Sequence, residues 1–396
     1  MQIVVSDPLT EGSFLKKFTT YQVMSHVAVR RRYSDFEWLL TALRSRFVGM
    51  LLPALPEKKA IKTDDSVIRS RVRGLNLFLS TLVANEYVQT DPDLRSFLTL
   101  SDSGAWENAK RQHVDHALHD PSAGLLKWRE MLERSELPAN LDRVVVEMKQ
   151  NLEPVIKVLQ QLTTATKRLA DRAGSYAAGM SDMESGWAEW AAHERISNDT
   201  AERPSAVFGD LDGAMTHSSA MFQNWKDILT FQPSINELLL HENIKFQMLQ
   251  ACAMRELLKQ REVLIDKHNK ANQKLEKLRG EQQNAASRGK ADKVAKLERD
   301  IGAAVSALEL ARSNMDMASR GLAGSEIQRF YREKNALLRE LMGQLSAAHF
   351  QFAKRLGVMW QGFLGDMKVD PHAMVEKARV VFSQAASCDG FDAGDE

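Results

Sequence analysis

The sequence predicts an α+β domain with a small antiparallel sheet and helices, followed by an all-α region of three long helices that form a coiled coil. Two observations predict this order. Short β-branched and aromatic segments fill the first 32 residues, and their composition is typical of strands. From about residue 139 onward the strand signals stop, and apolar residues recur at steps of three and four, as they do in helices that pack along a seam.

The first hundred residues predict three strands and then three helices. QIVVS, FTTYQVMS and HVAVRRR predict a meander of three strands. Ser34 and Glu37 match the capping-box pattern, so we expect the first helix to begin at SDFE. Apolar residues at steps of four and three predict a second helix over 68–82, and DPDLRSFLTL predicts a short third. Between the first two helices, the two prolines of LLPALPEKKA predict an extended segment.

The second half predicts long helices at about 139–195, 205–283 and 289–365, separated by the turn-rich ISNDTAERP and RGEQQNAASRG. Pro154 and Pro233 fall inside these patterns and are expected to kink the helices. The helix expected over 235–279 would span roughly 68 Å at about 1.5 Å per residue. Because so long a helix cannot bury itself in a monomer of this size, we expect a partner helix, most simply from an antiparallel homodimer.

A heptad seam runs along the third long helix. It consists of Val294, Leu297, Ile301, Ala304, Leu308, Ala311 and Met315. We expect Leu297, Ile301, Leu308 and Met315 to form the core of the coiled coil and of the dimer.

Composition excludes several classes of protein. The chain has 396 residues, 44% of them hydrophobic, and a net charge of +1, so we expect two or three globular domains and no nucleic-acid partner. Cys252 and Cys388 are expected to be reduced thiols in the cytosol. No long apolar run and no secretory signal pattern occur, so any membrane contact is expected from the surface. Because the sequence has no nucleotide-binding, metalloprotease or nucleophile motif, we expect no catalytic activity and no cofactor.

The stretch VRRRYSDFEW places three arginines beside one aromatic ring. A guanidinium matches a phosphate group bidentately, and a tyrosine ring offers a flat surface to an inositol ring. Three arginines at a strand end would, alone, more often be a solvated edge. Here RRYSDF, LPALPEKK and RVRGLNLFL follow one another in the order strand, helix, proline loop, helix. This order resembles the phox-homology (PX) domain, a phosphoinositide-binding domain, over roughly residues 1–104.

The resemblance implies roles for four residues of this chain. Arg32 would bind the 3-phosphate, Tyr33 would support the inositol ring, Lys58 would meet the 1-phosphate, and Arg71 would bond the 4- and 5-hydroxyls. Arg30 and Arg31 would be surface charge. Ala54 replaces the second proline of the usual PPLP loop, which puts the stiffness of that loop in doubt. A ligand for an SH3 domain is the other interpretation of Pro53 and Pro56.

The three-helix region behind this domain, 139–368, is similar to the BAR half of PX-BAR sorting nexins. That resemblance implies a homodimer or heterodimer that binds phosphatidylinositol 3-phosphate, works on the cytosolic face of early endosomes, and senses or tubulates membranes in cargo retrieval. LPEKKA and the tryptophan of GAWENA resemble the subgroup linked to endosomal recycling and autophagy. The alternative is a coiled-coil scaffold or tether that does not bend membranes.

A basic cluster lies where the second and third long helices meet. Only Glu276, Glu281 and Asp292 oppose its members, which are Lys267, Lys270, Lys274, Lys277, Arg279, Arg288, Lys290, Lys293 and Lys296. Near an anionic leaflet each cation contributes on the order of 1 kcal/mol, so we expect membrane contact here. A solvated hairpin is the alternative.

The segment 105–138 is expected to be a linker with an amphipathic helix in SAGLLKWREMLERSE. Its apolar face includes Trp128, which would either enter the headgroup layer of a membrane or pack against the long helices. His113, His116 and His119 imitate the spacing of a metal site, but no further ligand joins them, so we expect no metal. Residues 369–396 are expected to be an acidic tail, disordered over SCDGFDAGDE.

Overall fold

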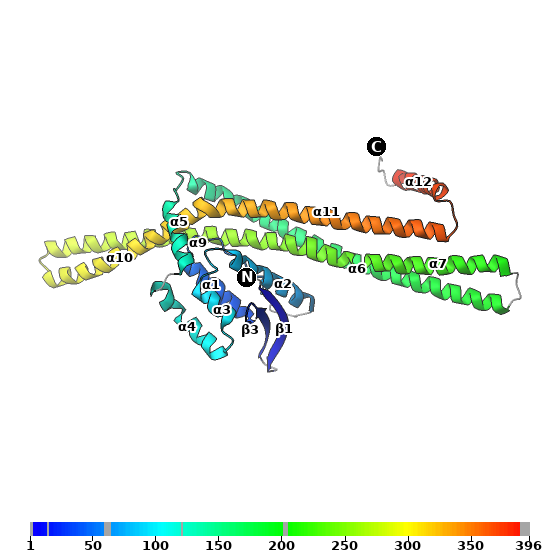
Figure 1. Ribbon diagram of the computed structural model, residues 1–396. Helices are drawn as coiled ribbons and strands as arrows, with labels where there is room; N and C mark the ends of the chain where they lie inside the picture. The colour runs from blue at the N-terminus through cyan, green and yellow to red at the C-terminus, as the bar shows by residue number, and fades with distance from the viewer. Residues whose placement is uncertain (1–2, 14–15, 59–64, 120–121, 201–204, 389–396) are drawn as a thin grey trace. The chain divides into compact units, whose positions relative to one another are not determined.

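The computed structural model describes residues 3–13, 16–58, 65–119, 122–200 and 205–388 (Figure 1). The chain forms two compact units. The first unit comprises Met1–Gln160 and Lys245–Ala336, and the second comprises Gln161–Ile244 and Leu337–Glu396. The α+β domain lies wholly in the first unit. Among the described residues no helix is long and apolar enough to cross a membrane.

The expected three-stranded meander is confirmed. Strands β1 (Val4–Ser13), β2 (Lys16–Met24) and β3 (Ala28–Arg32) pair antiparallel in that order. The register of β1 against β2 shifts between Ser6 and Leu9. On one face of the sheet Val5, Tyr21, Val23 and Val29 are buried, and they pack against the helices that follow.

The three helices of the α+β domain also form where the sequence predicts them. They are α1 (Tyr33–Arg46), α2 (Asp65–Ala84) and α3 (Pro92–Thr99). The start of α1 differs from the expectation, because Asp35 rather than Glu37 reaches back to cap it. The Oδ2 atom of Asp35 accepts a hydrogen bond from the backbone N–H of Arg32 at 2.8 Å, so the helix begins one residue before Ser34.

The segment expected to be a linker consists mostly of two helices, α4 (Ser103–His119) and α5 (Ala123–Arg134). Trp106 of α4 and Trp128 of α5 are buried in the same hydrophobic core as the sheet and α1 to α3. The segment therefore extends the α+β domain instead of separating it from the long helices. The side chains of His113, His116 and His119 lie outside the described residues.

The helical half follows the expected order with two interruptions. Its elements are α6 (Leu141–Thr200), α7 (Ser205–Leu229), α8 (Gln232–Ile235), the π-helical turn η1 (Asn236–His241), α9 (Glu242–Ser287), α10 (Ala291–Gly321), the π-helical turn η2 (Leu322–Glu326) and α11 (Ile327–Asp366). Pro154 lies inside the unbroken α6. Pro233 lies in the first turn of α8, where a proline costs no helical hydrogen bond. The helix is interrupted just before it, because α7 ends at Leu229 and α8 begins at Gln232.

A further helix, α12 (Pro371–Cys388), occupies most of the segment expected to be an acidic tail. Residues 389–396, which make up most of SCDGFDAGDE, lie outside the described residues. Within the first unit, α6, α9 and the start of α11 share a second hydrophobic core. Its members include Leu141, Val145, Met254, Leu258 and Phe330.

Candidate functional site

Three of the four expected lipid-binding residues meet around one aromatic ring. Tyr33 opens α1, Lys58 follows the proline loop, and Arg71 lies on α2. The Nζ atom of Lys58 is 5.8 Å from the centre of the Tyr33 ring, and the guanidinium carbon of Arg71 is 5.4 Å from it. The Tyr33 hydroxyl donates a hydrogen bond to the carbonyl oxygen of Pro56. Two cations therefore flank a ring whose hydroxyl is tied to the loop.

Arg32 is exposed and is supported by a residue that the sequence analysis did not single out. Its guanidinium carbon lies 3.7 Å from the centre of the Phe18 ring, a distance at which a cation is attracted to the aromatic face. The register of the sheet explains the contact, because Thr20 pairs with Arg32 and Phe18 lies two residues away on the same face. Pairing of the two predicted strands was the signal that could have found Phe18.

Glu37 adds a negative charge to this group. Its Oε2 atom pairs with the Nζ atom of Lys58 at 2.7 Å, and both side chains are more than a third exposed, so the pair contributes little to stability. Burial, reinforced by the Glu37 carboxylate, raises the pKa of Tyr33 to about 12. The phenol therefore stays protonated and remains a donor to Pro56.

The expectation that Arg31 is surface charge is wrong. Alternation along β3 turns Arg31 to the face opposite Arg30 and Arg32, where only 2% of it is exposed. It donates hydrogen bonds to the carbonyl oxygens of Phe97 at 2.9 Å and Leu100 at 2.6 Å, at the end of α3. Burial lowers the pKa of Arg31 to about 10.

Arg30 lies on the exposed face of β3, as expected. Its Nη1 atom forms an ion pair with Asp7 at 2.7 Å. Of the three consecutive arginines, Arg30 is paired with a carboxylate, Arg31 is buried on backbone carbonyl groups, and Arg32 is exposed without an ion pair to the described residues.

The proline loop is held at its far end by a glycine of the RVRGL motif. A Cβ atom built on Gly74 would lie 2.8 Å from the Cβ atom of Pro56, a separation that real side chains do not tolerate. Glycine at position 74 therefore lets α2 approach the loop closely. Ala54 packs against the second hydrophobic core, so the loop is fixed by packing at the position where the usual proline is missing.

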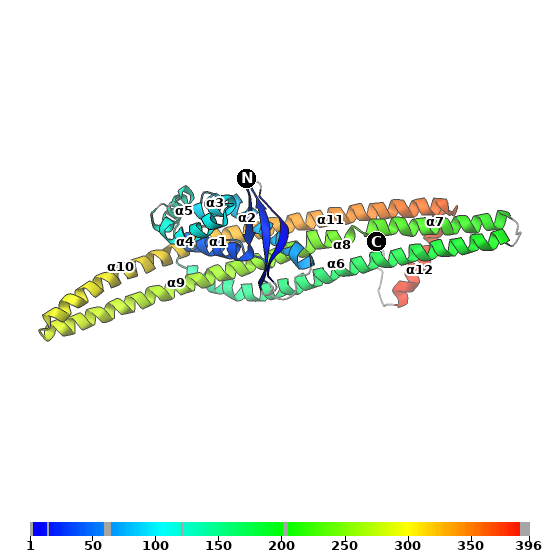
Figure 2. The same cartoon turned by 90° about the horizontal axis from the view of Figure 1, so that it is seen from below.

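The nine residues of the basic cluster are all exposed, on the last turns of α9, the first turns of α10 and the connection between them. We call this set the basic tip. Within the described residues, Lys270 is the member that forms an ion pair, with Asp266 at 2.7 Å. Figures 1 and 2 both show α9 and α10 side by side as a hairpin. The tip presents positive charge with little compensation, as an anionic surface requires.

The heptad seam of α10 lies toward α9 of the same chain. Leu297 and Ala304 are buried, and Ile301, Leu308 and Met315 are partly buried. The coiled-coil interpretation therefore holds within one hairpin. Dimerisation through the same residues stays a prediction.

Trp128 packs inside the protein, which is the second of the two interpretations that the sequence left open. Only 1% of it is exposed, and its Nε1 atom donates a hydrogen bond to the carbonyl oxygen of Val48 at 3.1 Å. The Tyr87 ring lies edge-on to it at 5.3 Å. The apolar face of α5 covers protein, because it packs between the α+β domain and α10.

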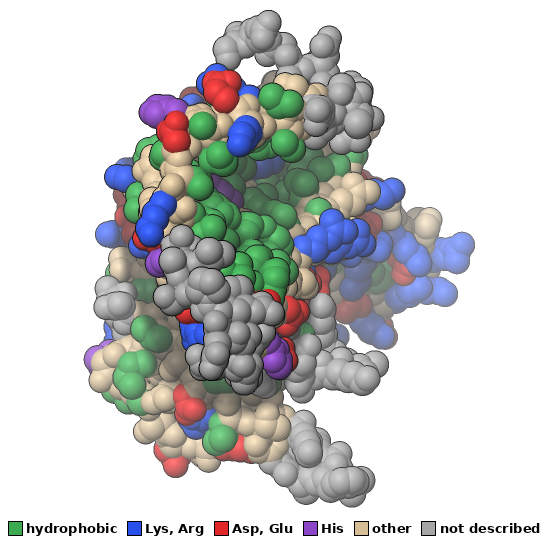
Figure 3. Space-filling model, turned by 90° about the vertical axis from the view of Figure 1, so that its right-hand side faces the viewer, with side chains coloured by type: hydrophobic (Ala, Val, Ile, Leu, Met, Phe, Trp, Pro, Cys, Tyr) green, Lys and Arg blue, Asp and Glu red, His purple; other side chains and the backbone are tan. Residues whose placement is uncertain are grey.

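The second unit carries an apolar groove that the sequence analysis did not identify. It lies between α7 and α11, has a volume of about 630 Å³, and is lined by residues such as Met221, Ile228, Val358 and Phe363. Figure 3 shows hydrophobic side chains gathered in a hollow on this side of the molecule. A Cβ atom built on Gly357 or Gly362 of α11 would meet no atom within 4 Å.

Comparison with known proteins agrees with this architecture. A family model described as the PX domain matches residues 19–101. Sorting nexin mvp1 of Aspergillus fumigatus is 26% identical over 299 residues, which are 72% of this chain and 40% of that protein. Sorting nexin-33 of Homo sapiens is 25% identical over 256 residues, which are 63% of this chain and 42% of that protein.

A solved structure shares the fold of nearly the whole chain. The cryo-EM structure of the SNX-BAR Mvp1 tetramer matches with a TM-score of 0.68 at 14% identity, covering 92% of this chain and 100% of that one. In sequence, the chain spans less than half the length of the curated sorting nexins that it matches.

Proposed function

We propose that the chain works as a PX-BAR sorting nexin, which binds phosphatidylinositol 3-phosphate and acts as a dimer on the cytosolic face of endosomal membranes in cargo retrieval. The observation that carries the proposal is the cluster of Lys58 and Arg71 around the Tyr33 ring, with Arg32, the preceding residue in the chain, exposed. Guanidinium and ammonium groups beside one ring suit a phosphorylated sugar, because they meet phosphate oxygens while the ring meets the sugar face.

The basic tip would supply a second, less selective contact. Its nine exposed cations suit the anionic cytoplasmic leaflet, and their attraction falls as ionic strength rises. A dimer would present two lipid pockets and two tips, so that each later contact forms at high effective concentration. This combination supports membrane sensing or tubulation over the alternative of a tether that does not bend membranes.

The groove of the second unit supports self-association. An apolar hollow between two helices, with Gly362 among its lining residues, suits a closely approaching partner helix. The solved relative forms a tetramer. We propose that this face contributes to the dimer, with a second copy or a related PX-BAR chain as partner. No catalytic step belongs to the proposal.

Liposome sedimentation tests the lipid assignment. The vesicles contain phosphatidylserine with phosphatidylinositol 3-phosphate, phosphatidylinositol 4-phosphate or phosphatidylinositol, at low and at physiological salt. Arg32→Ala should abolish the preference for the 3-phosphate, because each hydrogen bond to a charged group contributes about 1.5 to 3 kcal/mol. Arg30→Ala is the matched control, since it removes the same charge from the same face of β3. Equal 3-phosphate preference in wild type and Arg32→Ala would refute the assignment.

The same vesicles, tested for binding by sedimentation and for tubules by electron microscopy, separate membrane bending from tethering. Replacing Lys290, Lys293 and Lys296 with Glu should weaken binding to anionic vesicles and stop tubulation, while binding of a soluble headgroup stays unchanged. Replacing the same three with Arg is the control, because it keeps the charge. Full tubulation by the Glu variant would instead favour a solvated hairpin.

A further inference from the structure

In the first unit, the α+β domain and the long helices each place a residue in the hydrophobic core of the other. Leu51, at the start of the proline loop, is buried in the second hydrophobic core, among residues of α6, α9 and α11. Leu52, the next residue, is buried in the core of the α+β domain. In return, Met317 of α10 packs against that first core. The start of the proline loop is therefore part of both cores at once.

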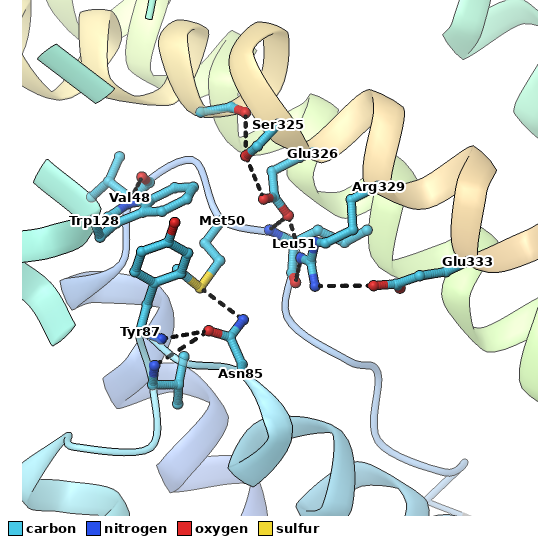
Figure 4. Close-up of polar contacts among 12 residues, drawn as sticks. Val48, Met50, Leu51, Asn85, Tyr87, Trp128, Ser325, Glu326, Arg329 and Glu333 are labelled. Atoms are coloured by element: carbon cyan, nitrogen blue, oxygen red, sulfur yellow. Dashed lines mark hydrogen bonds and ion pairs between the residues drawn. The ribbon is translucent and has the colours of Figure 1, made fainter. Parts of the chain in front are cut away.

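The backbone of Leu51 is held by two charged side chains of the helical half (Figure 4). Its N–H donates to the Oε2 atom of Glu326 at 2.8 Å, and its carbonyl oxygen accepts from Arg329 at 2.6 Å. Arg329 also pairs directly with Glu326, and Ser325 donates to the Oε1 atom of Glu326 at 2.8 Å. We call Glu326 and Arg329 the loop clamp.

The position of Glu326 makes this more than a surface contact. Only 2% of the residue is exposed, and burial of a carboxylate is costly unless charged and hydrogen-bonding partners surround it. Glu326 closes η2, and a single π-helical turn inside an α-helix often marks a functional position. Burial of the Glu326 carboxylate therefore costs desolvation energy, and its hydrogen bond to the Leu51 backbone offsets part of that cost.

The two backbones approach each other without side chains between them. Gly49 has a φ of +82°, and a Cβ atom built on it would lie 2.7 Å from the carbonyl oxygen of Met317. A Cβ atom built on Gly321 would lie 2.6 Å from the carbonyl oxygen of Gly49. Only glycine fits at either position. The segment that leads into the clamp is thus seated directly on α10.

The clamped residue opens the loop that carries the lipid-binding lysine. The chain runs from Leu51 through Ala54, which packs on the helical core, to Pro56, which packs on Gly74 and accepts from Tyr33, and then to Lys58. The loop is thus fixed by the helical half at its start and by the lipid pocket at its end. A segment held only at one end would sample many more conformations.

We propose that Glu326 and Arg329 are positioning residues for phosphoinositide binding. They hold the proline loop in the conformation that presents Lys58 beside Tyr33, so the affinity of the lipid pocket depends on the helical half. This inference rests on the proposed function. A clamp that merely stabilises the chain would leave the affinity of the folded protein unchanged, and this difference can be measured.

The test uses the full chain with Glu326→Gln, which keeps the size of the side chain but removes its charge. Glu333→Gln is the matched control, because Glu333 lies 3.7 Å from the same Arg329 but is half exposed and does not contact the loop. Arg329→Lys is a second variant. It keeps the positive charge but loses the guanidinium fork, and it replaces Glu326→Gln if that protein does not fold.

Three quantities are measured: helicity, backbone hydrogen exchange, and calorimetric affinity for soluble short-chain phosphatidylinositol 3-phosphate. Glu326→Gln should speed exchange over residues 49–58 and leave α1 and α2 protected. The affinity should fall about five- to tenfold, as expected if the competent loop conformation is populated at about 10 to 20%. Glu333→Gln should match wild type in all three.

Three results would overturn the inference. If Glu326→Gln and Arg329→Lys bind the soluble lipid as tightly as wild type while Arg32→Ala does not bind, the clamp is structural only and the proposed function stands. If affinity falls without faster exchange over 49–58, the loop is not what the clamp controls. If wild type binds no phosphoinositide, the proposed function fails and the inference fails with it.

Discussion

Replacement of Trp128 tests whether α5 is part of the protein core. The indole is the largest fully buried side chain of the described residues. It touches three parts of the first unit: the carbonyl oxygen of Val48, the ring of Tyr87, and the α10 backbone at Gly321, where a built Cβ atom would lie 3.1 Å from the indole. Trp128→Ala removes all three contacts at once.

The expected magnitude follows from these contacts. Truncation of a buried aromatic side chain to alanine costs about 3 to 5 kcal/mol of unfolding free energy, and the Val48 carbonyl also loses its donor. Trp128→Phe keeps most of the buried area and loses the hydrogen bond, which costs about 0.5 to 1.5 kcal/mol. We therefore expect alanine to be much more destabilising than phenylalanine.

Urea unfolding followed by circular dichroism measures both variants, and liposome sedimentation follows the membrane affinity of folded Trp128→Phe. Arg134→Ala is the control, because this exposed residue on the same helix pairs only with Glu130 among the described ion pairs. Trp128→Phe should bind membranes as wild type does. If Trp128→Ala is as stable as wild type but loses membrane affinity, the indole is a membrane anchor and the reasoning is wrong.

Two further predictions concern the pocket and the groove. Because the pKa of Tyr33 is raised from 10 to about 12, the unfolded chain loses this proton first, so the contribution of Tyr33 to stability is complete below pH 10 and is lost as the pH rises to 12. The difference between the absorbance titrations of wild type and Tyr33→Phe at 295 nm isolates this one phenol. It should ionise near pH 12, and ionisation near pH 10 would contradict the burial argument. Gly362→Leu should fill the groove of the second unit and yield monomers in sedimentation equilibrium, whereas Gly302→Leu, at an open position on α10, should leave the oligomer unchanged; a dimer in both would place the interface elsewhere.

The elements that could be predicted are those set by local periodicity. The three strands, the first three helices and the hairpin of α9 and α10 follow from the spacing of apolar residues. The cations around Tyr33 were assigned by motif, and the fold brings Lys58 and Arg71 to the ring. Arg31 failed because its environment depends on where α3 ends. Alternation of a strand predicts that Arg31 faces away from Arg32, but carbonyl groups some 65 residues later decide that its face is buried.

Trp128 shows a different limit of sequence reasoning. An amphipathic helix has the same pattern whether its apolar face meets lipid or protein. The balanced charge of α5 left both interpretations open. What decides between them is the shape of the opposing surface, which here includes Gly321 of α10, far away in the chain. The groove between α7 and α11 was missed for a related reason, since glycines inside a helix do not reveal whether they face open space.

Glu326 shows why the loop clamp could not be predicted. In the sequence it is one acidic residue among many on a long helix, and such residues are usually solvated. Its partner is a backbone N–H group 275 residues away, and a backbone group has no sequence signature. The same holds for Gly49, whose neighbour Ala318 carries no motif. Contacts between backbones depend on the fold alone.

The loop clamp also gives α10 a mechanical role in the proposed function. Lys293 and Lys296 of the basic tip lie at the start of this helix. Gly321 lies at its end, and the loop clamp follows directly. Its 31 residues span roughly 45 Å at about 1.5 Å per residue. Because the loop clamp and the contact at Gly321 tie the proline loop to this helix, we expect the lipid pocket and the tip to keep a nearly fixed distance. Binding of the headgroup then presents the tip to the same membrane at high effective concentration, whereas a flexible linker would disperse it over many orientations.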